Sequence, residues 1–94
     1  MANTALITGA SGGIGLELAK IHAQQGGDLV LVARSEDKLN QLKNELESEY
    51  QSKVFVIAED LSDPESADRV AASVEAMGLQ IDTLVNNAGF GGHG

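Results

Sequence analysis

Short aliphatic runs alternate with stretches of helical periodicity along this chain. The runs lie at residues 5–8, 29–33, 54–58 and 83–86. They are mostly continuous in apolar residues and do not alternate with polar ones, which is typical of strands buried on both faces of a parallel sheet. Each run therefore predicts a strand, and each intervening stretch predicts a helix that connects it to the next strand.

The first two helices have clear ends in the sequence. The first is predicted over residues 13–25 and ends at Gly26 and Gly27, since glycine adopts the left-handed conformation that terminates a helix. Ser35 stands where a side chain can cap the second helix. The apolar face of that second helix consists of Leu39, Leu42 and Leu46. These leucines predict a helix packed against the sheet.

The third helix is predicted from a different signal. Asp63 followed by Pro64 is typical of a capping residue and the first position of a helix. The apolar side of this helix consists of Ala67, Val70, Val74 and Met77. As in the second helix, such a stripe is interpreted as core.

A glycine-rich turn, Thr-Gly-Ala-Ser-Gly-Gly-Ile-Gly, occupies residues 8–15. Gly9 suits a sharp turn from strand to helix, while Gly12 and Gly13 let a cofactor pyrophosphate approach bare backbone. Gly15 lets the helix lie close to the sheet, and the N–H groups at the helix start face the phosphates. The pattern predicts a dinucleotide phosphate site, although its spacing can be read in two ways and a plain glycine-rich loop is the alternative.

The second predicted strand ends at Ala33, and Arg34 follows it. In a dinucleotide-binding fold, an acidic side chain here would bind the ribose hydroxyls, whereas a nearby arginine accommodates a 2′-phosphate. The pattern therefore predicts NADP(H) in preference to NAD(H), with Ser11 or Ser35 as a possible further donor. The alternative is that Arg34 is a solvated residue that pairs with Glu36 or Asp37.

Composition limits the class of protein. The chain has 94 residues, 43% of them hydrophobic but only 3% aromatic, which fits one small domain with an aliphatic core. It has no cysteine, no basic segment leading into a hydrophobic one and no apolar run long enough to cross a bilayer, so a cytoplasmic protein is expected. The net charge of −8 and the scattered basic residues argue against nucleic acid or a membrane as partner.

Two further motifs follow the third and fourth predicted strands. Residues 59–62 read Glu-Asp-Leu-Ser, and residues 86–89 read Asn-Asn-Ala-Gly. Both lie at carboxyl ends of strands, where open α/β sheets bind ligands. Together with the glycine-rich turn, they resemble the short-chain dehydrogenase/reductase family in its main single-domain branch. The Asn-Asn-Ala-Gly run is the most discriminating, and the three motifs together decide against a plain loop.

The resemblance, with the features above, predicts the cofactor-binding residues. They are Gly9, Ser11, Gly12, Gly13, Ile14, Gly15, Arg34, Asp60, Leu61, Asn87, Ala88 and Gly89. By resemblance, the glycine-rich turn would line the phosphate and ribose path, and Asp60 would accept a hydrogen bond from the adenine amino group. Leu61 would pack near the base, and residues 87–89 would flank the ribose. Taken alone, Asp60 fits a solvated carboxylate in an acidic stretch.

The family's catalytic group, a Ser and then a Tyr-x-x-x-Lys pair, follows these motifs, and no such pair occurs in these 94 residues. Tyr50 is followed by Lys53, a spacing of three and not four, in the turn before the third strand. We interpret both as surface residues at a helix end. No catalytic residue is predicted in this chain, which alone is expected to reduce no carbonyl substrate.

Other chemistries are disfavoured. No lysine and hydroxyl pair follows the glycines as in a P-loop, and Ser11 does not stand in a Gly-x-Ser-x-Gly elbow. His22 and His93 have no second ligand at a metal-binding spacing, so no metal site is predicted.

The sequence as a whole predicts an α/β, partial Rossmann fold with an open parallel sheet of four strands in the order 3-2-1-4 and three helices. Residues 1–94 would be the N-terminal half of a dinucleotide-binding domain from an NADP(H)-dependent reductase of a small carbonyl or alcohol. Truncation after the fourth strand would leave an open edge that favours self-association. The competing hypothesis is a naturally short, non-catalytic nucleotide-binding or interaction module.

Overall fold

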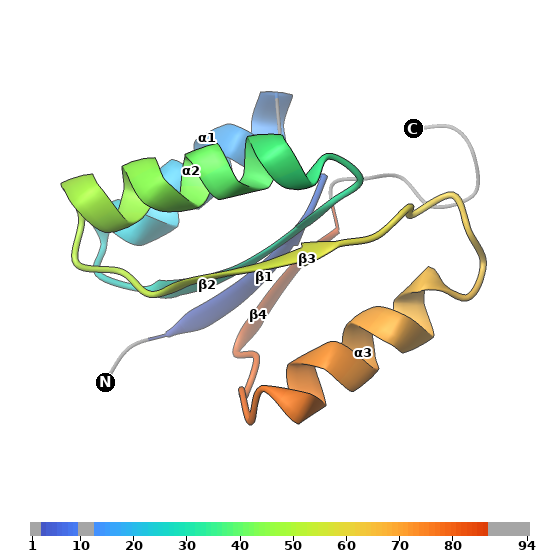
Figure 1. The fold of residues 1–94 in the computed structure, drawn as a ribbon. Helices are drawn as coiled ribbons and strands as arrows, with labels where there is room; N and C mark the ends of the chain where they lie inside the picture. Colours follow the sequence, from blue (N-terminus) through green and yellow to red (C-terminus); the bar gives the residue numbers. More distant parts are fainter. Residues whose placement is uncertain (1–2, 10–12, 87–94) are drawn as a thin grey trace.

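The computed structural model of the chain describes residues 3–9 and 13–86 (Figure 1). Strand and helix alternate throughout this part. The elements are β1 (Thr4–Thr8), α1 (Gly13–Gln24), β2 (Asp28–Ala33), α2 (Glu36–Glu49), β3 (Val54–Ala58), α3 (Ser66–Ala76) and β4 (Thr83–Asn86). Every strand begins within one residue of its predicted start, because each aliphatic run is long enough to define a buried strand by itself.

The strands form one parallel sheet in the order β3-β2-β1-β4, which confirms the predicted topology. β1 lies between β2 and β4, so that Leu6 has Val30 on one side and Leu84 on the other. Because all pairings are parallel, the carboxyl ends of the strands lie along one edge of the sheet.

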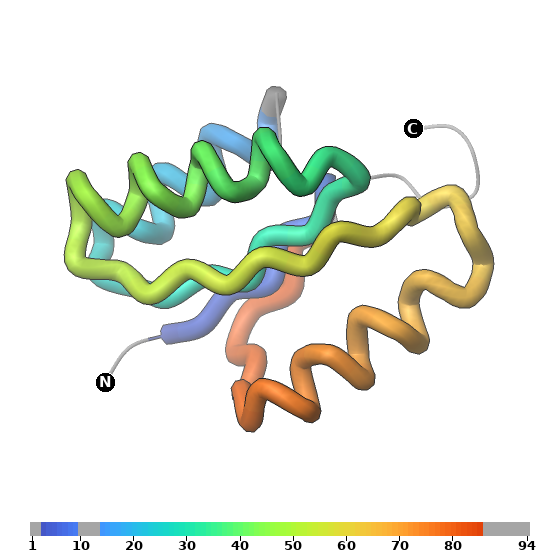
Figure 2. Tube along the Cα trace, in the orientation of Figure 1, coloured from blue at the N-terminus to red at the C-terminus, as the bar shows by residue number. Residues whose placement is uncertain are grey.

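The helices cover both faces of the sheet. α1 and α2 lie together on one face and α3 lies alone on the other (Figure 1, Figure 2). This follows from right-handed crossovers, because the chain moves from β1 to β2 to β3 in one direction across the sheet and returns from β3 to β4 in the other.

Two apolar clusters hold these layers together. Successive strand residues point to opposite faces, so Ile7 and Leu31 pack toward α1 and α2, whereas Leu6 and Val30 pack toward α3. The first cluster includes Ala19, Ala23, Leu29, Leu39, Leu42, Leu46 and Val54, and the second includes Val32, Ile57 and Val70. The leucine stripe predicted for the second helix is therefore core.

The face of the sheet toward α3 is less well covered at β4. Leu84 is 67% exposed, although its neighbour Leu6 on β1 is 6% exposed. On α3, Val70 is buried and Met77, which follows the helix, is 40% exposed. The apolar stripe predicted for the third helix is thus buried only in part.

Helix ends were predicted with mixed success. α1 ends one residue before the predicted limit, and Gly26 adopts a φ of 86°, a left-handed conformation that favours glycine. Ser35 occupies the capping position of α2 in an extended conformation, but its side chain makes no capping hydrogen bond.

The predicted start of the third helix is wrong. α3 begins at Ser66 with Glu65 at the capping position, and not at Asp63 and Pro64. Asp63 instead accepts a hydrogen bond from the Glu65 N–H at 2.9 Å, which closes a turn before the helix. The Asp-Pro pair therefore marks a turn that leads into the helix.

Candidate functional site

The carboxyl ends of the four strands bring the predicted motifs to one edge of the sheet. We call this the carboxyl edge and define it by Thr8–Gly9, Ala33–Arg34, Ala58–Asp60 and Asn86. Two backbone hydrogen bonds fix the chain where it leaves the strands: the Gly9 N–H donates to the Val32 carbonyl at 2.8 Å, and the Glu59 N–H donates to the Ala33 carbonyl at 3.0 Å. Segments distant in the sequence are thereby held side by side.

The turn after β1 needs its first glycine. Gly9 has a φ of 65°, a conformation that residues with a side chain rarely adopt. Gly13 begins α1, and the first N–H groups of a helix have no partner within the helix itself. Gly15 is buried in the first turn of α1, whereas Ile14 is 69% exposed and does not belong to the core. This geometry fits a phosphate cradle.

Arg34 is exposed on the bend that follows β2. Within residues 3–9 and 13–86, the guanidinium forms no ion pair with Glu36 or Asp37, because the salt bridges in this part of the chain belong to Arg69. Arg34 lies close enough to Asp60 on the neighbouring strand end to favour its ionised form. Its positive charge therefore lies near the carboxyl edge.

The carboxylate of Asp60 is ionised and is fixed by hydrogen bonds. Its Oδ1 accepts two hydrogen bonds from Ser62, one from the hydroxyl at 2.6 Å and one from the backbone N–H at 3.0 Å. These bonds, the hydroxyl one foremost, and then the charge of Arg34 hold the pKa of Asp60 below its ordinary value. Oδ2 has no hydrogen-bond partner among the described residues, so it is available to an external donor.

Leu61 anchors this loop to the core. Its side chain is partly buried and packs against the cluster of Val32, Ile57 and Val70 on the α3 side of the sheet. Asp60 and Leu61 therefore point in different directions, the carboxylate toward solvent and the leucine toward the core. A contact between Leu61 and an adenine base would have to use the part of the leucine that stays exposed.

Sequence reasoning missed Arg69, which organises the loop between β3 and α3. Its Nε donates to Glu59 Oε1 at 2.8 Å and its Nη2 donates to Asp63 Oδ2 at 2.9 Å. The Glu65 N–H and then Arg69 hold the pKa of Asp63 low, and these two carboxylates raise the pKa of Arg69. The only signal in the sequence was an arginine close to an acidic stretch, which is also typical of a solvated surface.

Several predicted residues lie outside the described part of the chain. These are Ser11, Gly12, Asn87, Ala88, Gly89 and His93. The structure therefore gives no geometry for their roles.

The residues predicted not to be functional lie at the opposite edge. Tyr50 follows α2, where its N–H donates to the Leu46 carbonyl at 2.9 Å, and Lys53 immediately precedes β3. The His22 Nε2 donates to the Asn3 carbonyl at 2.6 Å. No group of three or more metal-ligating side chains occurs in the part of the chain that the structure describes.

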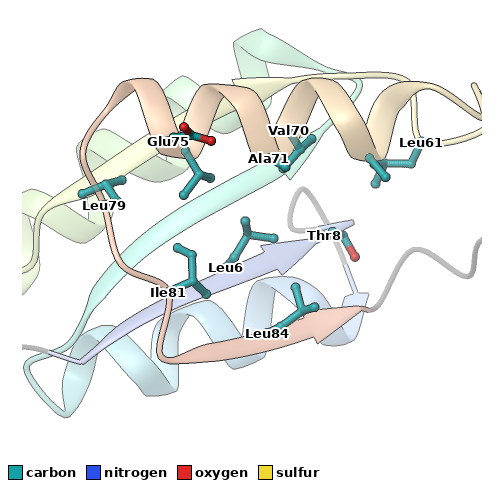
Figure 3. Close-up of a pocket in the computed structure, with 11 residues that line it drawn as sticks. Leu6, Thr8, Leu61, Val70, Ala71, Glu75, Leu79, Ile81 and Leu84 are labelled. Atoms are coloured by element: carbon teal, nitrogen blue, oxygen red, sulfur yellow. The ribbon is translucent and has the colours of Figure 1, made fainter.

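A separate apolar groove lies between α3 and the β1–β4 part of the sheet (Figure 3). Its volume is about 470 Å³, and its lining includes Leu6, Val70, Val74, Ile81 and Leu84. Among the described residues that line it, Glu75 is the one with an ionisable side chain. An aliphatic surface of this kind suits packing against another polypeptide segment better than binding a phosphate.

The fold and the carboxyl edge together define a chain of the Rossmann type, with its candidate ligand site at the strand ends. The family model described as "short chain dehydrogenase" matches residues 3–94, and the chain belongs to this family. Among the described residues, no helix is long and apolar enough to cross a membrane.

Curated relatives are much longer than this chain. It is 41% identical over 85 residues to the very-long-chain 3-oxoacyl-CoA reductase of Kluyveromyces lactis, and the alignment covers 90% of this chain and 25% of that protein. It is 42% identical over 87 residues to an uncharacterized oxidoreductase of Mycobacterium tuberculosis, and that alignment covers 92% of this chain and 34% of the relative. The chain thus aligns with only part of each relative.

Solved structures share the fold closely. The L-sorbose reductase of Gluconobacter frateurii, complexed with NADPH and L-sorbose, is 41% identical with a TM-score of 0.88, over 96% of this chain and 34% of that one. The alcohol dehydrogenase of the archaeon Thermococcus sibiricus, complexed with 5-hydroxy-NADP, is 36% identical with a TM-score of 0.84, over 89% of this chain and 36% of that one.

Proposed function

We propose that this chain is the NADP(H)-binding, N-terminal part of a short-chain reductase. The observation that carries the proposal is Arg34, which stands at the carboxyl edge, directly after β2, without an ion-pair partner among the described residues. A guanidinium in that place can bind a 2′-phosphate with two parallel hydrogen bonds. In the full-length parent, NADP(H) would exchange a hydride with a small carbonyl or alcohol substrate.

The neighbouring residues would each bind one part of the cofactor. The positive φ of Gly9 turns the chain toward the start of α1, whose N–H groups would face the pyrophosphate. Oδ2 of Asp60 would accept a hydrogen bond from the adenine amino group. Residues 11–12 and 87–89, outside the described residues, would complete the phosphate and ribose contacts as the family resemblance implies.

Two relatives with this fold support NADP(H) over NAD(H), because their structures were determined with NADPH and with 5-hydroxy-NADP. The chemical step would use residues of the parent beyond these 94, since no Tyr-x-x-x-Lys pair occurs here. The substrate is proposed only as a class, a carbonyl compound or the corresponding alcohol.

The test is a comparison of ligands that differ only by the 2′-phosphate. The affinity of the chain for 2′,5′-ADP is measured against its affinity for 5′-ADP, and that for NADPH against that for NADH. The proposal expects the phosphorylated ligand to bind more tightly in both pairs. Equal affinities would refute the preference for NADP(H), and no binding of any of the four would refute nucleotide binding itself.

We also propose that the chain self-associates through the β4 side of the sheet. Leu84 is 67% exposed at the apolar groove, and among the described residues β4 pairs only with β1. Sedimentation of the wild type should show a dimer or larger assembly that L84E dissociates. A monomer at all concentrations would contradict the proposal. Separately, a native gene product of 9.8 kDa, the mass of this chain, would favour the short-module alternative.

A further inference from the structure

Arg69, in the first turn of α3, joins the two ends of the β3–α3 loop. Its two hydrogen bonds go to Glu59 at 2.8 Å and to Asp63 at 2.9 Å, and these acceptors stand on either side of Asp60 in the chain. The planar guanidinium has donors on separate nitrogens, so it can hold two carboxylates in a fixed relative position.

The other bonds of the loop act on Asp60 itself. The Asp63 N–H donates to the Asp60 carbonyl at 3.0 Å, and Ser62 donates twice to Asp60 Oδ1. The Glu59 N–H is bound to the Ala33 carbonyl of β2 at 3.0 Å. Hydrogen bonds therefore hold the residues on both sides of Asp60, and the Arg69 side chain connects them through Glu59 and Asp63.

Exposure argues that the Arg69 bridge orders the loop and adds little to global stability. The side chains of Arg69 and Asp63 are 44% and 41% exposed, and that of Glu59 is 18% exposed. Ion pairs in such positions contribute little to the stability of a fold. Ordering a binding loop before the ligand arrives, by contrast, lowers the entropy lost on binding.

We propose that Arg69 is a positioning residue, which fixes the β3–α3 loop so that Oδ2 of Asp60 is directed to the adenine amino group. The inference rests on the proposed function. It adds that recognition of the adenine depends on a side chain that does not contact the cofactor.

The experiment compares two cofactors that differ at the group in question. Deamino-NADPH carries hypoxanthine in place of adenine, so an oxygen replaces the amino group. Dissociation constants for NADPH and deamino-NADPH are measured for the full chain as wild type, R69A and R69K, with K20A as the control. Lys20 is exposed on α1, on the other face of the sheet, and its loss changes the net charge by the same amount.

The wild type should prefer NADPH by about tenfold, the value of one hydrogen bond to a charged acceptor. R69A should lose most of this preference by weakening NADPH alone, R69K should recover part of it, and K20A should retain it in full. Far-UV circular dichroism tests whether each variant is folded. If R69A does not fold, R69K, which keeps a cation at the site, still tests the proposal.

Other results overturn the inference in distinguishable ways. If R69A weakens both cofactors equally, Arg69 has only a structural role. If R69A keeps the full preference, the loop does not depend on it. A wild type that binds both cofactors alike removes the adenine contact but leaves NADP(H) binding intact, whereas a wild type that binds neither refutes the proposed function as well.

Discussion

Replacing Arg34 with alanine tests the proposed 2′-phosphate site with one change. The side chain is exposed and has no ion-pair partner among the described residues, so its removal breaks no salt bridge of the described fold. The loss should therefore appear in cofactor binding and not in stability. R34K is the matched variant, because lysine keeps the charge but lacks the planar fork.

The magnitude follows from the surroundings of Arg34. A hydrogen bond to a charged group contributes about 1.5–3 kcal/mol. The lower end applies here, because Arg34 is exposed to solvent and the ionised Asp60 nearby opposes the approach of a phosphate. About 1.5 kcal/mol corresponds to roughly tenfold weaker binding of NADPH, and NADH should change by less than about twofold.

Binding is measured from the fluorescence of the reduced nicotinamide, which is excited at a wavelength where protein side chains do not absorb. Both cofactors are titrated at the same ionic strength, since the phosphate contact depends on salt. R34K should lie between the wild type and R34A for NADPH. Equal losses for NADPH and NADH in R34A would refute the 2′-phosphate role, and an unchanged NADPH affinity would refute any role in binding.

Three further predictions concern the fold. The Ser66 hydroxyl is buried without a hydrogen-bond partner among the described residues, so S66A should raise the free energy of unfolding by about 1 kcal/mol in urea denaturation; a loss would reveal a hidden partner. L39A should cost the dilute, monomeric chain about 2–5 kcal/mol, because Leu39 is fully buried, and L84A less than about 1 kcal/mol, because Leu84 is 67% exposed within one chain. Similar losses in the two monomeric variants would mean that Leu84 is covered within the chain itself. Asp60 and Asp63 have lowered pKa values when folded, so their contribution to stability is present at neutral pH and is lost as the pH falls through those values, below the ordinary value of 3.8. The free energy of unfolding should therefore fall more steeply on acidification in the wild type than in D63N, and parallel curves would contradict this.

The strands and their order were predictable because each depends on a local signal and one general rule. Aliphatic runs such as residues 29–33 define strands buried on both faces, and right-handed crossovers then leave few ways to order them. The start of α3 was not predictable in the same way. Asp63 carries the local signature of a capping residue, yet it closes a turn and pairs with Arg69.

The candidate site likewise has features that the sequence predicts and features that it does not. The glycine turn and the strand-end position of Asp60 could be predicted from spacing, because parallel strands bring their carboxyl ends together. The structure was needed to show that Arg34 forms no ion pair with Glu36 or Asp37 among the described residues, and that its charge helps to lower the pKa of Asp60. The bridge from Arg69 to Glu59 spans ten residues and two elements, and nothing in the sequence pattern specifies which carboxylate it selects.

The proposed function requires the cofactor to bind along the carboxyl edge. Binding there can be followed by the change in backbone amide chemical shifts of the isotope-labelled chain on addition of NADPH. The largest changes should occur at Gly9, Arg34 and Asp60, with little change at His22 and Gly26 on the opposite edge. Changes concentrated at the opposite edge or in the apolar groove, or none at all at saturating NADPH, would contradict it.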